Sequence, residues 1–217
     1  MRRHWEYAVP IHPFKLGVLI LIACEMAVAE TSIRHVDFKN FDYAWSGPPG
    51  WSDRLEWQET SERRHVRLVH GRWQEDTEHE ESGPRFSGLT LETVEFADVT
   101  GDGKEDAIVV LRFDTGGTQY SHYVYIYSFA ARKPKLLAYF HSGDRAYAGL
   151  YRVYGEHGQL VVELFDPEKR SGDCCSSAFV RTRYRWHNGS FEAFGEHELG
   201  TPKAPSRLPV TVFGTHM

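Results

Sequence analysis

Three aspartates recur at every fourth position in one short stretch of the chain, "ADVTGDGKEDAIVV", where two apolar runs flank a cluster of carboxylates and glycines. They are Asp98, Asp102 and Asp106. Without a counter-ion, three like charges so close in sequence repel one another. Calcium takes about six to eight oxygen ligands, several of them carboxylates, from a flexible loop. The spacing therefore predicts a calcium site.

The ligand set follows from counting positions along this loop, with Asp98 as the first. Side-chain oxygens then fall at the first, third, fifth and ninth positions, and Lys104 offers its backbone carbonyl at the seventh. A metal-free acidic turn between two strands is the alternative reading of the same residues. The predicted calcium ligands are Asp98, Thr100, Asp102, Lys104 and Asp106.

The loop does not match an EF-hand. Gly103 stands where a calcium loop turns sharply, which fits either type of loop. The twelfth position, however, is Val109, where an EF-hand needs a bidentate glutamate. Helices do not flank the loop in the sequence pattern either, so we expect a loop between strands.

The stretch "DVTGDGKED" resembles the calcium loop of the FG-GAP and VCBS repeats, which is known from integrin α-subunit propellers and from exported bacterial proteins. The resemblance implies a calcium ion held by the side chains of Asp98, Asp102 and Asp106 and the carbonyl of Lys104. Thr100 departs from the usual Asn or Asp, which implies weaker affinity. Only one copy is present, and a propeller needs several blades, so we do not expect a full propeller.

The segments on either side of this loop, which must position it, have the sequence pattern of β-strands. Val, Ile, Tyr and Phe alternate with polar residues in runs bounded by turn residues, a pattern typical of strands. In "FVRTRYRWHNGSFEAF", Asn188 and Gly189 separate two aromatic-rich runs, which is a strong hairpin signal. We predict a mainly β, antiparallel, sandwich-like single domain over residues 30–200, followed by a disordered tail over residues 201–217.

The strand "TQYSHYVYIYSF" carries a stripe of tyrosines, Tyr123, Tyr125 and Tyr127, on one side. Tyrosine combines apolar area with a polar tip, so this stripe could be a contact face for a partner. Packing of the same stripe into a core is the competing interpretation, because strands usually bury one face.

The N-terminal segment has the features of an export signal. Basic residues precede a short apolar run that is too short to span a bilayer. Ala27 and Ala29 fit the small-residue rule for cleavage before Glu30, which makes residues 1–29 a signal peptide. Alternatively, "LIAC" resembles a bacterial lipobox, in which the signal ends at residue 23 and Cys24 is lipidated.

After cleavage before Glu30, only Cys174 and Cys175 remain, and they are adjacent. In an oxidising compartment they could close a vicinal disulfide, pair between chains or stay reduced and buried. We expect a structural role, because a catalytic dithiol normally has two residues between its cysteines.

The later part of the chain resembles exported β-rich proteins of environmental bacteria, on the stretches "GDRAYAGLYRVYGEHGQLVVELF" and "RTRYRWHNGSF". The pair of cysteines followed by "YRW" is also similar to a group of mycobacterial lipoproteins. This resemblance implies an extracytoplasmic location, periplasmic, secreted or lipid-anchored. It implies no activity.

Composition limits the classes of function. The net charge is −5 and the basic residues are scattered, so we expect no nucleic-acid partner, and membrane contact only through a lipid anchor. Nucleophile-elbow, HExxH, P-loop and dinucleotide motifs are missing from the sequence. We therefore predict a calcium-stabilised binding or structural module for a protein, peptide or glycan, with a motif-free hydrolase as the alternative.

Overall fold

The computed structural model describes residues 32–47, 55–58, 64–77, 85–116, 120–144, 146–171 and 175–202. These ranges all belong to one compact unit, Thr31–Met217. The predictions for the signal peptide, for Cys24 and for all but the start of the tail fall outside the described residues, and so does Cys174.

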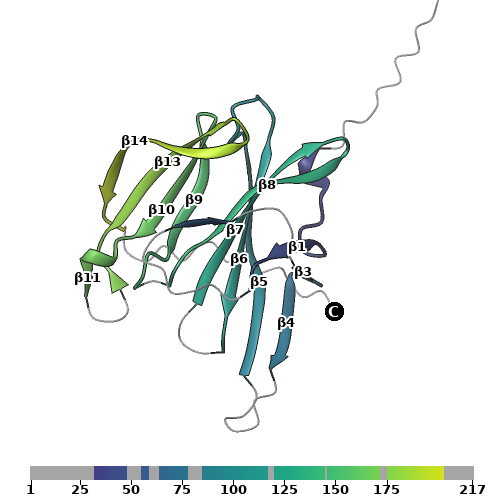
Figure 1. The fold of residues 1–217 in the computed structure, drawn as a ribbon, viewed down its shortest axis with the longest axis horizontal. Helices are drawn as coiled ribbons and strands as arrows, with labels where there is room; N and C mark the ends of the chain where they lie inside the picture. The colour runs from purple at the N-terminus through teal and green to yellow at the C-terminus, as the bar shows by residue number, and fades with distance from the viewer. Residues whose placement is uncertain are drawn as a thin grey trace, which may run out of the picture. The chain divides into compact units, whose positions relative to one another are not determined.

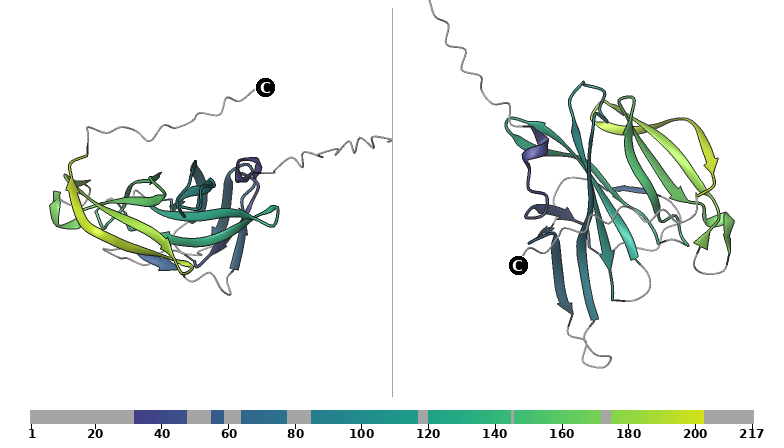
Figure 2. Two further views of the ribbon diagram at one scale, coloured as in Figure 1. Left: turned by 90° about the horizontal axis from the view of Figure 1, so that it is seen from above. Right: turned by 180° about the vertical axis from the view of Figure 1, so that it is seen from behind.

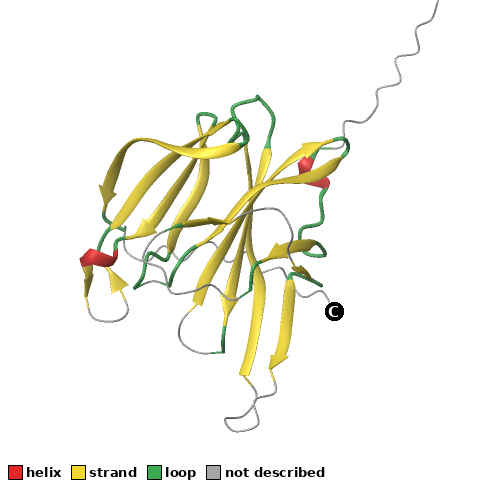
Figure 3. Cartoon of the chain, in the orientation of Figure 1, coloured by secondary structure: helices red, strands yellow, loops and turns green. Residues whose placement is uncertain are grey.

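Nearly all regular secondary structure of the described chain is β-strand (Figure 1, Figure 3). The two helical elements, η1 (Ile33–His35) and η2 (Pro167–Lys169), are single 3-10 turns. Neither of these helices is long and apolar enough to cross a membrane. The strands are β1 (Asp42–Trp45), β2 (Glu56–Gln58), β3 (Arg64–Arg67), β4 (Arg72–Thr77), β5 (Arg85–Ala97), β6 (Asp106–Asp114), β7 (Tyr120–Ala130), β8 (Lys133–His141), β9 (Leu150–Glu156), β10 (Gln159–Phe165), β11 (Arg170–Ser171), β12 (Cys175–Ser176), β13 (Phe179–His187) and β14 (Ser190–Gly200).

Two larger antiparallel sheets carry the architecture. A six-stranded sheet has the order β2-β8-β7-β6-β5-β4, and a four-stranded sheet has the order β14-β13-β10-β9. Two small sheets, β1-β3 and β11-β12, complete the described strands. The prediction of a mainly β, antiparallel fold is confirmed, and the described sheets form neither a closed barrel nor a propeller.

The hairpin turns follow the sequence signals closely. Asn188 and Gly189 both have positive φ, 49° and 88°, which the two-residue turn between β13 and β14 requires. His157 and Gly158 also have positive φ, 53° and 73°, in the two-residue turn between β9 and β10. Residues 64–74, "RHVRLVHGRWQ", also alternate in the way typical of one strand, but the chain turns at His70 and Gly71 and separates β3 from β4.

One face of the six-stranded sheet, here called the tyrosine face, is buried. Tyr123 and Tyr125 are fully buried and Tyr127 is 4% exposed, packed under β1, β3 and the segment that follows η1. The phenol of Tyr125 donates a hydrogen bond to the carbonyl of Ala44 (2.8 Å), and that of Tyr123 donates to the carbonyl of Gly47. The expectation of a contact face on these tyrosines is therefore wrong, because the stripe packs a core.

The opposite face of the six-stranded sheet packs against the four-stranded sheet. This second core joins residues of β6, β7 and β8 to residues of β9, β10, β13 and β14. The arrangement makes a two-sheet packing, which Figure 2 shows from two further directions. Its larger members are Ile108, Val124, Ile126, Phe140, Leu160, Val162, Tyr184 and Phe191.

Candidate functional site: the carboxylate loop and the β5 groove

The carboxylate loop, residues 98–106, joins β5 to β6. Ala97 and Asp106 are the last cross-strand pair before the chain leaves the ladder. Gly101 and Gly103 have positive φ, 75° and 81°, so the loop turns where residues with side chains would be strained. The prediction of a glycine-bent loop between two strands is confirmed.

Backbone amides bind the carboxylates at the exposed end of the loop. Asp98 accepts hydrogen bonds from the N–H of Gly101 (2.6 Å) and of Gly103 (2.9 Å). Asp102 accepts one from the N–H of Lys104 (2.9 Å). These contacts hold the chain in a tight turn and orient the acidic side chains.

Asp106 differs from the other two aspartates because it is buried. Its Oδ2 accepts hydrogen bonds from the N–H of Val99 (3.1 Å) and from the N–H and hydroxyl of Thr100 (3.2 and 3.1 Å). Burial raises the pKa of Asp106 to about 6, and the charge of Asp102 adds to this, whereas the hydrogen bonds lower it. A bound cation would favour the ionised form of this carboxyl.

The donor set of the loop fits calcium by its chemistry. All five predicted ligands supply oxygen, and one carboxylate oxygen each of Asp102 and Asp106 accepts no hydrogen bond from the described residues. The carboxylates are not drawn together into a ready chelate, because the described part of the chain contains no close group of three or more His, Cys, Asp or Glu side chains. Calcium binding thus requires the acidic side chains to converge.

The loop touches elements on both sides of the six-stranded sheet. Gly101 packs against Gly158 in the β9–β10 turn, where a Cβ on Gly158 would lie 3.2 Å from the Cα of Gly101. Arg34 and Glu105 form a two-point ion pair, in which Nε of Arg34 donates to Oε2 of Glu105 (2.5 Å) and Nη2 of Arg34 donates to Oε1 (2.6 Å). The loop therefore links the four-stranded sheet to the chain that covers the tyrosine face.

A stretch of β5 has no strand partner along its outer edge. β4 pairs with residues 85–90 only, and the N–H of Leu91 donates to the carbonyl of Gly71 (2.8 Å). Beyond that contact, over residues 92–97, no strand of the described ranges pairs with this edge of β5. β9 is likewise the last strand of its own sheet.

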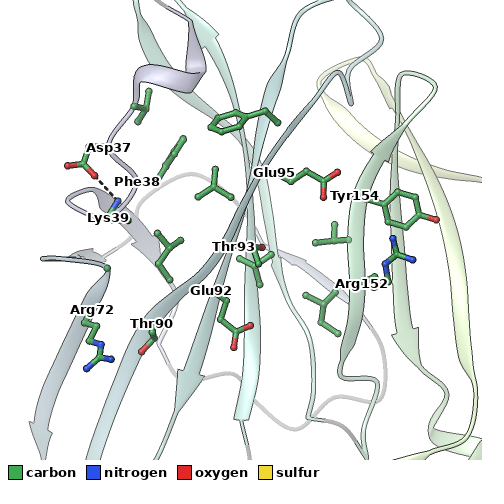
Figure 4. A pocket seen from close by; sticks show the side chains of 18 of the residues that line it. Asp37, Phe38, Lys39, Arg72, Thr90, Glu92, Thr93, Glu95, Arg152 and Tyr154 are labelled. Carbon is green, nitrogen blue, oxygen red and sulfur yellow. Dashed lines mark hydrogen bonds between the residues drawn. The ribbon is translucent and has the colours of Figure 1, made fainter. Parts of the chain in front are cut away.

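A groove of about 1080 Å³ surrounds this open edge (Figure 4). Residues 36–39 and 70–72 line it on the tyrosine-face side, and residues 150–154 of β9 line it on the other side. Residues 90–96 of β5 and Val110 of β6 complete the lining. We call it the β5 groove.

The β5 groove is closed at one end by a close approach of two strands. A Cβ on Gly155 of β9 would lie 2.3 Å from the Cβ of Ala97, so only glycine allows the two strands to come this near. The N–H of Gly155 also donates to Oε1 of Glu95 (3.3 Å). The carboxylate loop begins directly after Ala97, so it lies at the closed end of the groove.

A β-bulge shapes the middle of the groove. The register of β5 against β6 shifts between Leu91 and Thr93, which leaves Glu92 as the extra residue. The carboxylate of Glu92 contacts two basic side chains. Its Oε2 lies 3.1 Å from Nε2 of the buried His122, and the Oε1 of Glu92 lies 3.6 Å from Nη1 of Arg112. Burial raises the pKa of Glu92, but the contacts with His122 and Arg112 outweigh burial and bring it below its usual value.

Neither Asp144 nor Cys175 belongs to a comparable polar site within the described residues. Asp144, which follows β8, accepts hydrogen bonds from the N–H of Ala146 (2.8 Å) and of Tyr147 (3.0 Å), so it holds a turn. The backbone of Cys175 pairs with Ser171 between β11 and β12. A disulfide between Cys174 and Cys175 stays a prediction, since Cys174 is outside the described ranges.

The groove residues do not stand out in the sequence. Three of them, Glu92, Glu95 and Arg152, have the pattern of ordinary polar positions in strands. The local sequence of a strand also does not indicate whether its edge pairs with another strand. One signal was present: the apolar positions Leu89 and Leu91 are two residues apart, but the next is Val94. A step of three in a strand indicates a bulge.

Comparisons with protein-family models, with curated proteins and with solved structures find no match to this chain.

Proposed function

We propose that this chain is an exported binding module, stabilised by calcium at the carboxylate loop, whose ligand occupies the β5 groove. The observation that carries the proposal is the groove itself, since it surrounds a strand edge that the described chain leaves unpaired. Its volume is close to the upper end of the usual range of ligand sites, and its lining combines apolar side chains with many polar and charged ones.

Calcium has a structural role in this proposal. The loop lies at the closed end of the groove and contacts both the β9–β10 turn and Arg34. An ion bound by Asp98, Asp102 and Asp106 would hold these elements in one arrangement and would relieve the mutual repulsion of the carboxylates. A rigid closed end fixes the separation of β5 and β9 on which the groove depends.

Thermal unfolding of the chain in calcium and in chelator tests the metal part. Calcium that binds only to the folded state raises the free energy of unfolding by about 2.7 kcal/mol when its concentration is a hundred times the dissociation constant. For a chain of this length we expect the melting temperature to rise by about 5–10 °C. Equal melting in both conditions would remove calcium from the proposal.

Mass spectrometry of the protein made in a bacterial host with its N-terminus intact tests export. A mature protein that starts at Glu30, or one that starts at a lipidated Cys24, supports an extracytoplasmic location. A chain that keeps Met1 and stays in the cytoplasm contradicts it.

The alternative, a hydrolase, finds no support in the groove. Glu92 and His122 form a carboxylate–histidine pair of the type that hydrolases use. However, Nε2 of His122 faces Glu92, and its Nδ1 is buried and lacks a partner among the described residues. Neither ring nitrogen is thus presented to a substrate, and the pair serves better to hold the bulge.

A further inference from the structure

The open edge of β5 also indicates which chemical class of ligand the groove takes. Resting on the function proposed above, we propose that the ligand is an extended polypeptide segment that adds to β5 as a strand, beyond the point where β4 ends. The six-stranded sheet would then gain a short additional strand between β5 and the walls of the groove.

The backbone edge selects for a polypeptide. A strand without a neighbour presents N–H and C=O groups at regular intervals, and only another extended backbone matches this pattern. Leu91 already uses one such group, since its N–H donates to the carbonyl of Gly71 (2.8 Å). Residues 92–97 continue the same edge, and the groove lies along it. Strand addition is a common mode of peptide recognition.

The two walls differ in polarity, which predicts the side chains of the ligand. On the tyrosine-face side, Val94 and Phe96 are partly buried hydrophobic residues beside the buried Phe38. On the other side, Glu95 and Arg152 are exposed and charged (Figure 4). Because side chains alternate along a strand, a ligand with apolar and polar residues in alternation fits both walls.

The ends of the groove limit the length of the ligand. The contact of Leu91 with Gly71 closes one end of the edge, and the approach of Ala97 to Gly155 closes the other. About six residues of an extended chain fit between these contacts. A short linear segment suits this space better than the flat edge of a large sheet.

Selection from a random library of seven-residue peptides tests the inference on the full chain in calcium. Enriched peptides are made in two forms, unmodified and N-methylated at alternate residues, which keeps the side chains but removes backbone donors. Amide exchange and NMR shifts locate each peptide. We expect proline-free alternating peptides that slow exchange over residues 93–97, and at least about a tenfold loss of affinity on N-methylation.

A matched pair of variants places the ligand in the groove. Glu95→Trp puts a bulky side chain on the exposed β9 side of β5 and should weaken the selected peptides at least about tenfold. Glu196→Trp makes the same change on an exposed position of β14 and should leave their affinity unchanged. Both positions are exposed, and unchanged unfolding curves of the two variants confirm that each folds.

Four results would overturn the inference: no enriched peptide, equal binding of both peptide forms, protection of another strand, or no effect of Glu95→Trp. The same amides are also followed against a panel of soluble oligosaccharides. If peptides fail and a glycan shifts residues 90–96, the groove is a binding site for another class of ligand. If both fail, the proposed binding function falls with the inference.

Discussion

At the scale of single residues, hydrogen bonds stabilise the charged carboxylates of the loop, whereas burial and mutual repulsion destabilise the charge of Asp106. Backbone amides donate hydrogen bonds to all three aspartates, but Asp98 and Asp102 lie toward the surface, whereas Asp106 is buried and its pKa is raised to about 6. A chain gains little from burying an acid next to other acids unless a cation accompanies them. This balance is the physical reason to expect a metal at a loop that also holds its shape through hydrogen bonds.

Asp102→Ala should abolish the calcium effect on stability. The variant loses a predicted ligand, so its melting temperature should be the same in calcium and in chelator. In chelator the free energy of unfolding of the variant should stay within about 1 kcal/mol of that of the parent. The hydrogen bond that the N–H of Lys104 donates to Asp102 is lost, but the repulsion between Asp102 and Asp106 is also removed. Differential scanning calorimetry in both conditions measures this.

Glu105→Gln is the matched control. Glu105 lies in the same loop but pairs with Arg34 and is outside the predicted ligand set. This exposed pair contributes little, so calcium should still stabilise the variant by most of the parental shift. A calcium response that survives in Asp102→Ala, or that disappears in Glu105→Gln, would refute the assigned ligands.

Glu92→Gln should make stability less dependent on pH. The folded protein lowers the pKa of Glu92, so its charge stabilises the fold above the unfolded pKa near 4.5, and this contribution is lost as pH falls through the folded pKa. At pH 7 we expect the variant to be less stable by about 1.5–3 kcal/mol, the usual value of hydrogen bonds to charged groups.

Urea unfolding at three pH values checks this effect. The difference between parent and Glu92→Gln should shrink as the pH falls through the lowered pKa of Glu92 in the folded protein, since the parent side chain then becomes neutral too. Glu196→Gln, at an exposed position of β14, should show no such trend. A constant difference at every pH would mean that packing, not charge, explains the role of Glu92.

At the scale of elements, sequence patterns predicted strands and turns well because both are local. Alternation identified β7, and Asn188 with Gly189 identified the turn between β13 and β14. The alternation at residues 64–74 misled, because it continues through a two-residue turn at His70 and Gly71, which both have positive φ and are closed by the pair Val69 and Arg72. The bulge at Glu92 was visible as a change of spacing, but its consequence depends on which face each neighbour covers.

Gly155→Ala should open the closed end of the groove. The new methyl group would meet the Cβ of Ala97 at 2.3 Å and Cγ1 of Val99 at 3.0 Å. Overpacking of this kind costs about 1–3 kcal/mol. Denaturant unfolding should show that loss, and exchange of amides in the carboxylate loop should become faster.

A second substitution provides the control for this prediction. Ala97→Gly removes the methyl group that Gly155→Ala would strike, so the double variant should recover most of the lost stability, apart from about 0.5–1 kcal/mol for glycine in a strand. If Gly155→Ala is as stable as the parent, or if Ala97→Gly fails to rescue it, the two strands are not held together at this point.

At the scale of the whole molecule, the sequence predicted the class of fold but not the place of the groove. A mainly β, antiparallel domain follows from patterning, and so does the glycine-bent acidic loop between β5 and β6. The tyrosine stripe shows the limit: alternation states that Tyr123 and Tyr125 share a face, but not that β1 and β3 cover it. An unpaired edge is a property of the sheet order, which strand patterns do not contain.

The central claim is that residues 92–97 of β5 present a free edge in a groove, and amide hydrogen exchange of the full chain without added ligand tests it most directly. We predict that alternate amides in this stretch exchange at least about a hundredfold faster than those of the central strands β6 and β7, because no strand of the described ranges pairs with the edge that faces the groove. Amides of residues 85–90, paired with β4, should be slower than the exposed ones. Uniform, slow exchange along the whole of β5 would show that the edge is already covered, and would contradict the account.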